Sequence, residues 1–489
     1  MKELPVTTPL IQCYPYHANL LSVIQNHSEA FPWILDNYLE LEMPDPPLDL
    51  RLDFSGPSLW KTCPFVYYQR IERHLVNTNW SNLWNFITQC INNGNYIYLL
   101  VNHYHLPVSR YYHNNKVIHD LFIYGYDEQT GMLKVADNFN NKYTYEYVAY
   151  KDIKQAYKDM NEEDDWVHGI ELIRYRSRPF CFDPLAIKEK LNRYLNSTNL
   201  FFHFRIPAEF YKLGWYYGIS VYDKLFNHLQ LIIEGKSGYD GRPFHVLYEH
   251  KTILHQLCNF LEQQGHLPEH YHLSLQFKEL AQQTLLLRNH YIKISMTNRL
   301  NMLDSLMTKI KQIKANEQLL LSQLINNLSG HNGMQENNLA QAAIITSNST
   351  SLNLKYPPSN LAIPDINMAY LSDEQPTFPV YIEFSWEQPQ AFNLIRIKTR
   401  FALSIGITDF VVELRRDQKT DWKKVYAVSN LPYEYNDFNI ETTEIKLPVM
   451  TNIKKLRFTI LHAHTVWNRF EINWIGIYDT TSCAENISL

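Results

Sequence analysis

The 489-residue sequence has few charged residues and few glycines, and each shortage excludes a class of protein. Charged residues make up 19% of the chain, below the usual share of about 25%. The formal net charge of −5 gives no basic surface for phosphate contacts, which argues against a protein that binds nucleic acid. The 15 glycines are too few for a collagen-like or low-complexity chain.

Cysteine pairs, long apolar runs and cofactor motifs are also lacking. The six cysteines are scattered and form no CxxC pair, which is typical of reduced thiols in the cytoplasm. No apolar run approaches the roughly 18 residues that cross a bilayer, and the N-terminus lacks the apolar segment of a secretory signal. A P-loop, a GxGxxG motif and an HExxH motif are missing. We therefore expect a cytoplasmic protein with no membrane span, cofactor or metal site.

The residues that are present predict a multidomain α+β protein. The length is about three times that of a typical domain, and apolar residues make up 45% of the chain. Mixed helix and strand patterns fill 1–180, and apolar residues at helical spacing predict a helical domain over 181–328. A polar segment, 329–344, reads as a linker. Over 345–482, about seven short strands with alternating apolar residues predict a β-sandwich or jelly roll.

The last predicted helix, 303–328, carries a stripe of apolar residues with nearly heptad spacing. The stripe consists of Leu303, Leu306, Ile310, Ile313, Leu320 and Leu324. Such a stripe fits either packing on the helix's own domain or self-association. The short heptad run favours the first interpretation.

A cysteine, a histidine and an aspartate in the first 180 residues form a candidate catalytic trio. Cys13 directly precedes a predicted helix, where the helix dipole favours the thiolate. His119 opens one strand of a predicted hairpin over 117–139, and Asp137 ends the partner strand. If the hairpin pairs about residue 128, the two side chains lie side by side on adjacent strands. Asp137 then orients the imidazole and leaves its second nitrogen for the thiol.

This trio supports acyl transfer. A thiolate attacks a carbonyl or thioester carbon while His119 carries the proton, and the acyl group then passes to water or to an amine. The residue pattern does not choose between the two acceptors. The competing interpretation is that Cys13 is a buried structural thiol in an inert, binding-only domain.

The segments that carry the trio, CYPYHANLLSVIQ and the hairpin VIHDLFIYGYDEQTGMLKVADNF, resemble the butirosin biosynthesis protein H-like acyltransferases. Cys13, His119, Gly125-Tyr126-Asp127 and Asp137 match that family's pattern. GRPFHVLYEHKTILHQL looks like its helical half. The resemblance covers about residues 8–300 and implies a papain-like fold.

The family's activity, implied by this resemblance, is acyl transfer from an acyl or peptidyl carrier protein thioester to a small amine, in natural-product biosynthesis. Papain-like enzymes usually carry an oxyanion-hole glutamine about six residues before the cysteine, where this chain has Thr7. Gln12, or backbone N–H groups, would supply the oxyanion hole instead. The alternatives are a cysteine peptidase or amidase that uses water, and a catalytically inert binding or scaffold protein.

The C-terminal strands resemble a discoidin-like (coagulation-factor type C) module. PVYIEFSWEQPQAFNLIRIKT looks like its early strand pair, and INWIGIYD looks like its closing strand. The resemblance implies a glycan or lipid-headgroup ligand at the loops of one end. Trp467 and Tyr435 are candidate ligand-binding aromatics, with a role in the core as the alternative for either.

Overall fold

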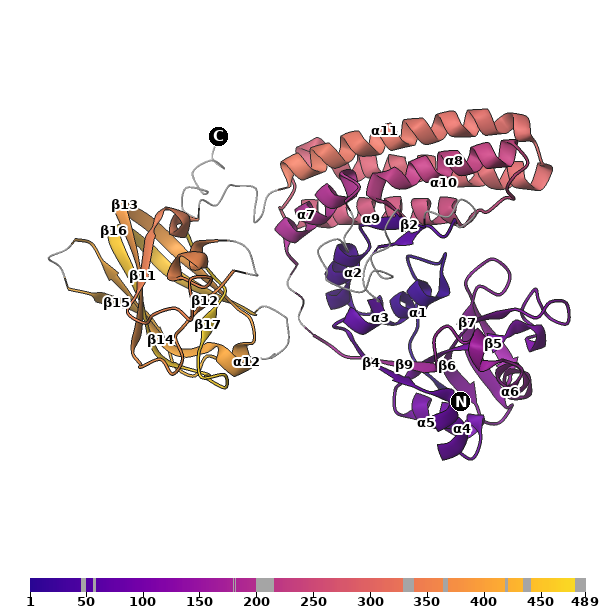
Figure 1. Cartoon of the computed structure of the whole chain (residues 1–489), viewed down its shortest axis with the longest axis horizontal. Helices are drawn as coiled ribbons and strands as arrows, with labels where there is room; N and C mark the ends of the chain where they lie inside the picture. The colour runs from indigo at the N-terminus through magenta and orange to yellow at the C-terminus, as the bar shows by residue number, and fades with distance from the viewer. Residues whose placement is uncertain are drawn as a thin grey trace. The chain divides into compact units, whose positions relative to one another are not determined.

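The protein is α+β and divides into two compact units, Met1–Gly333 and Met334–Leu489 (Figure 1). The computed structural model describes residues 1–44, 50–55, 59–178, 180, 182–198, 215–328, 338–363, 368–417, 421–433 and 441–479. The predicted boundary at residue 180 does not divide the core, because one apolar cluster runs from Leu4 to Leu328. No helix in the described part of the chain is long and apolar enough to cross a membrane. Four cysteines lie in the described ranges, and all four are free.

An antiparallel sheet in the order β4-β9-β5-β6-β7-β8 forms one half of the first unit, with β1 paired to β6. Its strands are β1 (Lys2–Glu3), β4 (Val66–Ile71), β5 (Tyr96–Asn102), β6 (Ile118–Asp127), β7 (Met132–Asp137), β8 (Thr144–Ala149) and β9 (Ile170–Tyr175). β5 is buried at every position, so the sheet is covered on both faces there. The predicted hairpin over 117–139 is β6 and β7.

The register of this hairpin differs from the predicted one. Phe122 pairs with Ala136, and a bulge follows between Ile123 and Gly125. Gly125 also pairs with Glu3, and a Cβ atom at Gly125 would lie 2.8 Å from the carbonyl oxygen of Lys2. Glycine is therefore needed where the N-terminal strand reaches the bulge.

Helices pack against this sheet, and those later in the unit, up to residue 328, form a second layer. They are α1 (Pro15–Ile24), α2 (Phe31–Asn37), α3 (Leu59–Thr62), α4 (Arg73–Asn79), α5 (Leu83–Asn92), α6 (Tyr150–Lys158), α7 (Pro184–Leu195), α8 (Val221–Ile233), α9 (Arg242–Gln263), α10 (Leu273–Thr297) and α11 (Leu303–Asn327). α10 packs on both α9 and α11 (Figure 1). A small sheet of β2 (Leu41–Met43), β3 (Asp53–Phe54) and β10 (Tyr216–Tyr217) completes the unit. All six apolar stripe residues of α11 are buried within the chain, as the self-packing interpretation expects.

A buried polar network joins α9 to α11. Lys251 Nζ lies 2.5 Å from Glu317 Oε1, and both side chains are fully buried. Tyr222 on α8 donates to the other Glu317 oxygen at 2.7 Å. Each polar group therefore has a partner, which is the condition under which buried charges are tolerated.

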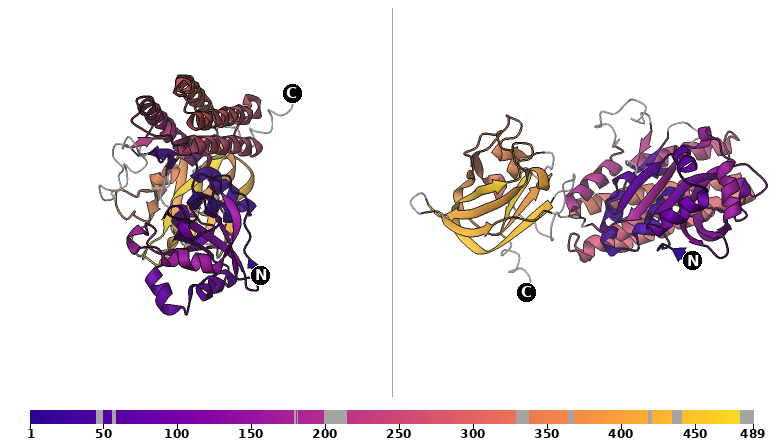
Figure 2. Two further views of the ribbon diagram at one scale, coloured as in Figure 1. Left: turned by 90° about the vertical axis from the view of Figure 1, so that its right-hand side faces the viewer. Right: turned by 90° about the horizontal axis from the view of Figure 1, so that it is seen from below.

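The second unit is a β-sandwich, as expected. Its elements are β11 (Ile344–Ser347), β12 (Tyr370–Leu371), β13 (Val380–Thr399), α12 (Ala402–Ile405), β14 (Ile407–Arg415), β15 (Lys423–Val428), β16 (Glu441–Ala463), β17 (Glu471–Ile472) and β18 (Trp474–Tyr478). β13 and β16 are long strands with irregular pairing between Ser385 and Leu394, and residues on both sides of this irregularity line one core. Figure 2 shows this unit in orange and yellow. Of the predicted linker, 329–337 lies outside the described residues. The remainder belongs to this unit, with Ala340 in its core.

Candidate active site

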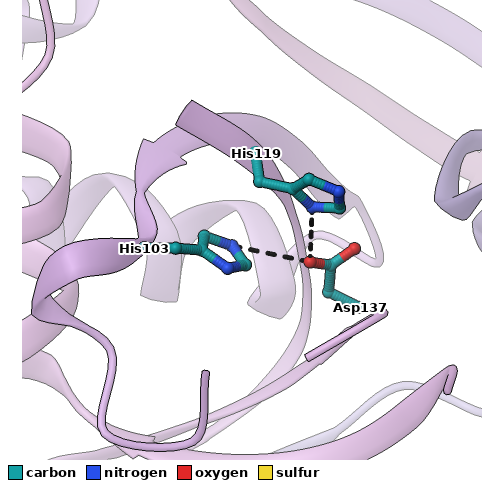
Figure 3. Close-up of side chains that lie close together, drawn as sticks. All are labelled: His103, His119 and Asp137. Atoms are coloured by element: carbon teal, nitrogen blue, oxygen red, sulfur yellow. Dashed lines mark hydrogen bonds and ion pairs between the residues drawn. The ribbon is translucent and has the colours of Figure 1, made fainter. Parts of the chain in front are cut away.

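The structure brings His119 and Asp137 together (Figure 3). His119 lies near the start of β6, and Asp137 ends β7. His119 Nδ1 is 2.8 Å from Asp137 Oδ2. The Asp137 side chain is fully buried, whereas that of His119 is 31% exposed. His119 Nε2 makes no hydrogen bond to any described residue, so the ring is held on one side and open on the other.

His103 is a third member of this cluster that sequence reasoning did not select. It follows β5 directly and is buried, with Nε2 at 3.5 Å from Asp137 Oδ2. Its Nε2 lies 3.0 Å from the carbonyl oxygen of Asp120, and its Nδ1 lies 3.1 Å from Ser109 Oγ. β5 and β6 pair Val101 with His119, so the register could have indicated that His103 is close.

The electrostatics of the cluster favour an imidazolium–carboxylate pair. Burial raises the pKa of Asp137 to about 6, although the charge of His119 opposes this shift. Burial alone would lower the pKa of His119, but the Asp137 carboxylate outweighs it and raises that pKa to about 9. Burial and the nearby His119 lower the pKa of His103 to about 3. Near neutral pH, His119 is therefore charged, Asp137 is ionised and His103 is neutral.

His103, His119 and Asp137 are also close enough to be considered as metal ligands, since their ligand atoms lie within 4.8 Å of one another. A backbone carbonyl only accepts hydrogen bonds, so the contact with Asp120 assigns the His103 proton to Nε2. A metal ligand needs that nitrogen without its proton. The hydrogen-bond pattern therefore favours a polar trio over a metal site.

The turn that carries Cys13 lies beside the end of β7. Asn138 Nδ2 donates to the carbonyl oxygens of Cys13 at 3.0 Å and of Gln12 at 3.3 Å. Asn138 directly follows Asp137. This contact therefore connects the backbone of Cys13 to the end of the strand that carries Asp137. α1 then begins at Pro15, because proline suits the first turn of a helix, where its missing N–H needs no partner.

The Cys13 thiol itself contacts α9 and makes no hydrogen bond to His119. Cys13 Sγ donates to the carbonyl oxygen of Arg242 at 3.6 Å. Burial, and next the Glu249 and Asp53 carboxylates, raise the pKa of Cys13 well above its ordinary value. We expected the helix N-terminus to favour the thiolate. In the structure, burial and the two carboxylates outweigh that effect.

Gln12 and Glu249 complete the surroundings of the thiol. The Gln12 side chain donates to the carbonyl oxygen of Pro9 at 3.0 Å, within its own loop. The backbone N–H groups of Gln12 and Cys13 both donate to the Glu249 carboxylate on α9. Sequence reasoning missed Glu249. The GRPFHVLYEH segment gives a signal for it, because His245 and Glu249 are spaced to share one helix face.

Comparisons with known proteins concern a small part of the chain. No family model matches the sequence, and no curated protein matches it. Solved structures similar to it include chitosan-binding module 1 of a chitosanase/glucanase from Paenibacillus sp. IK-5. That module is 17% identical, covers 29% of this chain and 98% of its own, and has a TM-score of 0.24. The module CpGH89CBM32-5 from Clostridium perfringens, in complex with GalNAc-β-1,3-galactose, is 12% identical, covers 28% and 96%, and has a TM-score of 0.23.

By their names, these neighbours are carbohydrate-binding modules. At this identity and TM-score, the likeness says nothing about a ligand. Of the two aromatics suggested by the sequence, Trp467 is 48% exposed, with its ring 5.3 Å from that of Phe401. Tyr435 lies outside the described residues.

Proposed function

We propose that the first unit is a papain-like cysteine acyltransferase with Cys13 as nucleophile, His119 as base and Asp137 as the residue that orients His119. The observation that carries this proposal is the 2.8 Å contact from His119 Nδ1 to Asp137, with His119 Nε2 left free. This is the arrangement by which a carboxylate fixes an imidazole for proton transfer. The hydrogen bond of Asn138 to the Cys13 backbone supports a common site.

The reaction has two balanced steps. His119 must be neutral to act as a base, so the imidazolium first loses its Nε2 proton to solvent. The Cys13 thiol then gives its proton to His119 Nε2, and the sulfur attacks the carbonyl carbon of a carrier-protein thioester. The carrier's C–S bond breaks, and the departing carrier thiolate takes the proton from His119. An amine then attacks the acyl-Cys13 carbonyl and gives its proton to His119. The Cys13 C–S bond breaks, and the proton returns to the Cys13 sulfur.

An acyl or peptidyl carrier protein as donor, and a small amine of natural-product biosynthesis as acceptor, complete the proposal. The match of Cys13, His119, Gly125-Tyr126-Asp127 and Asp137 to the butirosin biosynthesis protein H-like pattern supports these partners. With water as acceptor, the same first step gives a peptidase or amidase. The share of acyl-enzyme that passes to an added amine rather than to water separates the two reactions.

One observation favours the inert alternative, a binding or scaffold protein. The Cys13 pKa is raised and the thiol contacts Arg242 rather than His119, so the resting site does not hold a thiolate. A glycan ligand for the second unit is likewise a proposal. The exposed ring of Trp467 supports it as a surface on which a sugar can stack.

The decisive experiment is to incubate the full-length protein with an acyl-N-acetylcysteamine thioester and locate the acyl group by peptide mass mapping. We expect acylation of Cys13 in the wild type and none in Cys13→Ser. His119→Ala should slow acylation by roughly 10²–10⁴-fold. Cys90→Ala, which changes a thiol on α5, is the control and should react like the wild type. Turnover by Cys13→Ser at the wild-type rate would rule out this nucleophile.

A further inference from the structure

The Glu249 carboxylate occupies the two backbone N–H groups next to the proposed nucleophile. Glu249 Oε1 lies 2.5 Å from Gln12 N and 3.1 Å from Cys13 N, and Oε2 lies 3.4 Å from Cys13 N. Glu249 is only 3% exposed and lies 236 residues further along the chain. A buried carboxylate from a distant helix is therefore bound, as an anion would be, at the turn before α1.

This N–H pair lies where an acyl transfer at Cys13 needs hydrogen-bond donors. When a thiolate adds to a carbonyl carbon, the carbonyl oxygen becomes an oxyanion close to the nucleophile, and backbone N–H groups are its usual partners. In the resting structure, Glu249 holds both of these donors. A substrate oxygen and the Glu249 carboxylate cannot use them at the same time.

Glu249 has a second partner that would remain after such a displacement. His245, one turn earlier on α9, lies with Nε2 at 3.1 Å from Glu249 Oε1. Arg288 on α10 donates to His245 Nδ1 at 3.2 Å, which assigns the proton of the ring to Nε2. His245 therefore donates to Glu249, and the carboxylate keeps a charge-assisted hydrogen bond when it leaves the backbone.

We propose that Glu249 is an internal inhibitory occupant of the oxyanion-binding site formed by the N–H groups of Gln12 and Cys13, and that the carbonyl oxygen of the acyl donor must displace it. The inference rests on the proposed function for the identity of the displacing group. The first turn of α9 also contacts the nucleophile, since Cys13 Sγ donates to Arg242 O. The negative charge of Glu249 also disfavours the thiolate until the site is entered.

The test is the rate at which iodoacetamide alkylates Cys13 in the full-length protein at one fixed pH, measured by peptide mass mapping. Glu249→Gln keeps the shape and removes the charge, and we expect alkylation at least about tenfold faster, as for a thiol pKa lowered by about one unit. Glu249→Ala also empties the N–H pair and should react at least as fast. Unchanged rates in both variants would overturn the proposal. If Glu249→Ala does not fold, the nearly isosteric Glu249→Gln decides alone.

Two controls show whether the effect belongs to this site. Glu262→Gln removes a charge from the same helix about 20 Å away, where the carboxylate accepts from Ser274 N, and should leave the rate at Cys13 unchanged. Acetate, with chloride at equal ionic strength as reference, should refill the emptied N–H pair. It should slow alkylation in Glu249→Ala and leave the wild type unaffected. An accelerated Glu249→Ala that ignores acetate would contradict an anion site.

The same variants separate this inference from the proposed function. If both Glu249 variants alkylate faster and Glu249→Ala responds to acetate, but no thioester acylates Cys13 in any protein, the occupancy stands and the acyltransferase fails. If thioesters acylate Cys13 in the wild type and the Glu249 variants are no faster in either reaction, the acyltransferase stands and the inhibitory occupancy fails.

Discussion

His119 and Asp137 form their hydrogen bond diagonally across two neighbouring strands. The β6–β7 register pairs Phe122 with Ala136, and continuing it by one residue sets Leu121 opposite Asp137. The two side chains nevertheless meet at 2.8 Å, because diagonal neighbours on one face of a sheet are within reach of a long side chain. The imidazole is thus positioned by the strand register as well as by the carboxylate.

The first prediction concerns the charge that sets the pKa of His119. In Asp137→Asn the carboxylate that raises this pKa is gone, and burial, which lowers it, remains. We expect the pKa of His119 to fall from about 9 by at least one unit. NMR titration of histidine-labelled protein measures it directly. A value still near 9 in the variant would mean that Asp137 is not the dominant partner.

The second prediction is a pH dependence of stability. The folded-state pKa of His119 is raised, so its stabilising contribution is complete below about 6.5 and is lost as the pH rises through about 9. Asp137, with a pKa of about 6, is largely ionised across this window. The loss of unfolding free energy in His119→Gln should therefore shrink between pH 6.5 and 9.5. Urea denaturation followed by helical circular dichroism measures it, since the long helices of the described residues lie in the first unit.

The exposed His74 on α4 provides the matched control for this series. His74→Gln removes an imidazole from the same unit without touching the Asp137 cluster. Its effect on the unfolding free energy should stay constant over the same pH range. A loss in His119→Gln that also stays constant would show that the variant acts through packing and not through the ion pair.

Local features of the fold could be predicted from the sequence because they depend on neighbours in the chain. Cys13 before an apolar helix, the hairpin around Gly131 and the alternation in β14 all follow from periodicity and turn residues. The single core of the first unit could not be predicted in this way. A change from strand to helical period near residue 180 indicates a new layer, and only packing shows whether that layer has its own core.

The candidate site was predictable only where its residues share a hairpin. His119 and Asp137 are 18 residues apart, and any tight pairing brings them close. The bulge before Gly125 depends on the arrival of β1, and the contact of Glu249 with Cys13 joins residues 236 apart. Such contacts are set by the packing of whole layers, which a one-dimensional pattern does not contain. The contacts of Cys13 could therefore not be predicted from the sequence.

The last prediction tests the buried pair that joins α9 to α11. Lys251→Met leaves the Glu317 carboxylate buried without its cation, and should lower the free energy of unfolding by about 3–5 kcal/mol. Lys251→Met with Glu317→Leu removes both charges and should recover part of that loss. A deficit of about 1–3 kcal/mol should remain, because Tyr222 then has no acceptor. Urea denaturation followed by helical circular dichroism measures all three proteins.

A second ion pair on α11 supplies the comparison that decides the interpretation. Lys314 pairs with Asp223 at 2.6 Å, but the aspartate side chain is 54% exposed, so Lys314→Met should cost less than about 1 kcal/mol. Each lysine variant removes one ion pair that involves α11. The difference between their losses of unfolding free energy therefore reports the desolvation of the buried pair. If Lys251→Met costs no more than Lys314→Met, water reaches Glu317, and the network does not fix how α9 packs on α11. If Lys251→Met costs much more than Lys314→Met and the double variant removes the difference, the cost comes from the unpaired Glu317 charge. The network then fixes how α9 packs on α11, because a shifted helix would leave one buried charge without its partner.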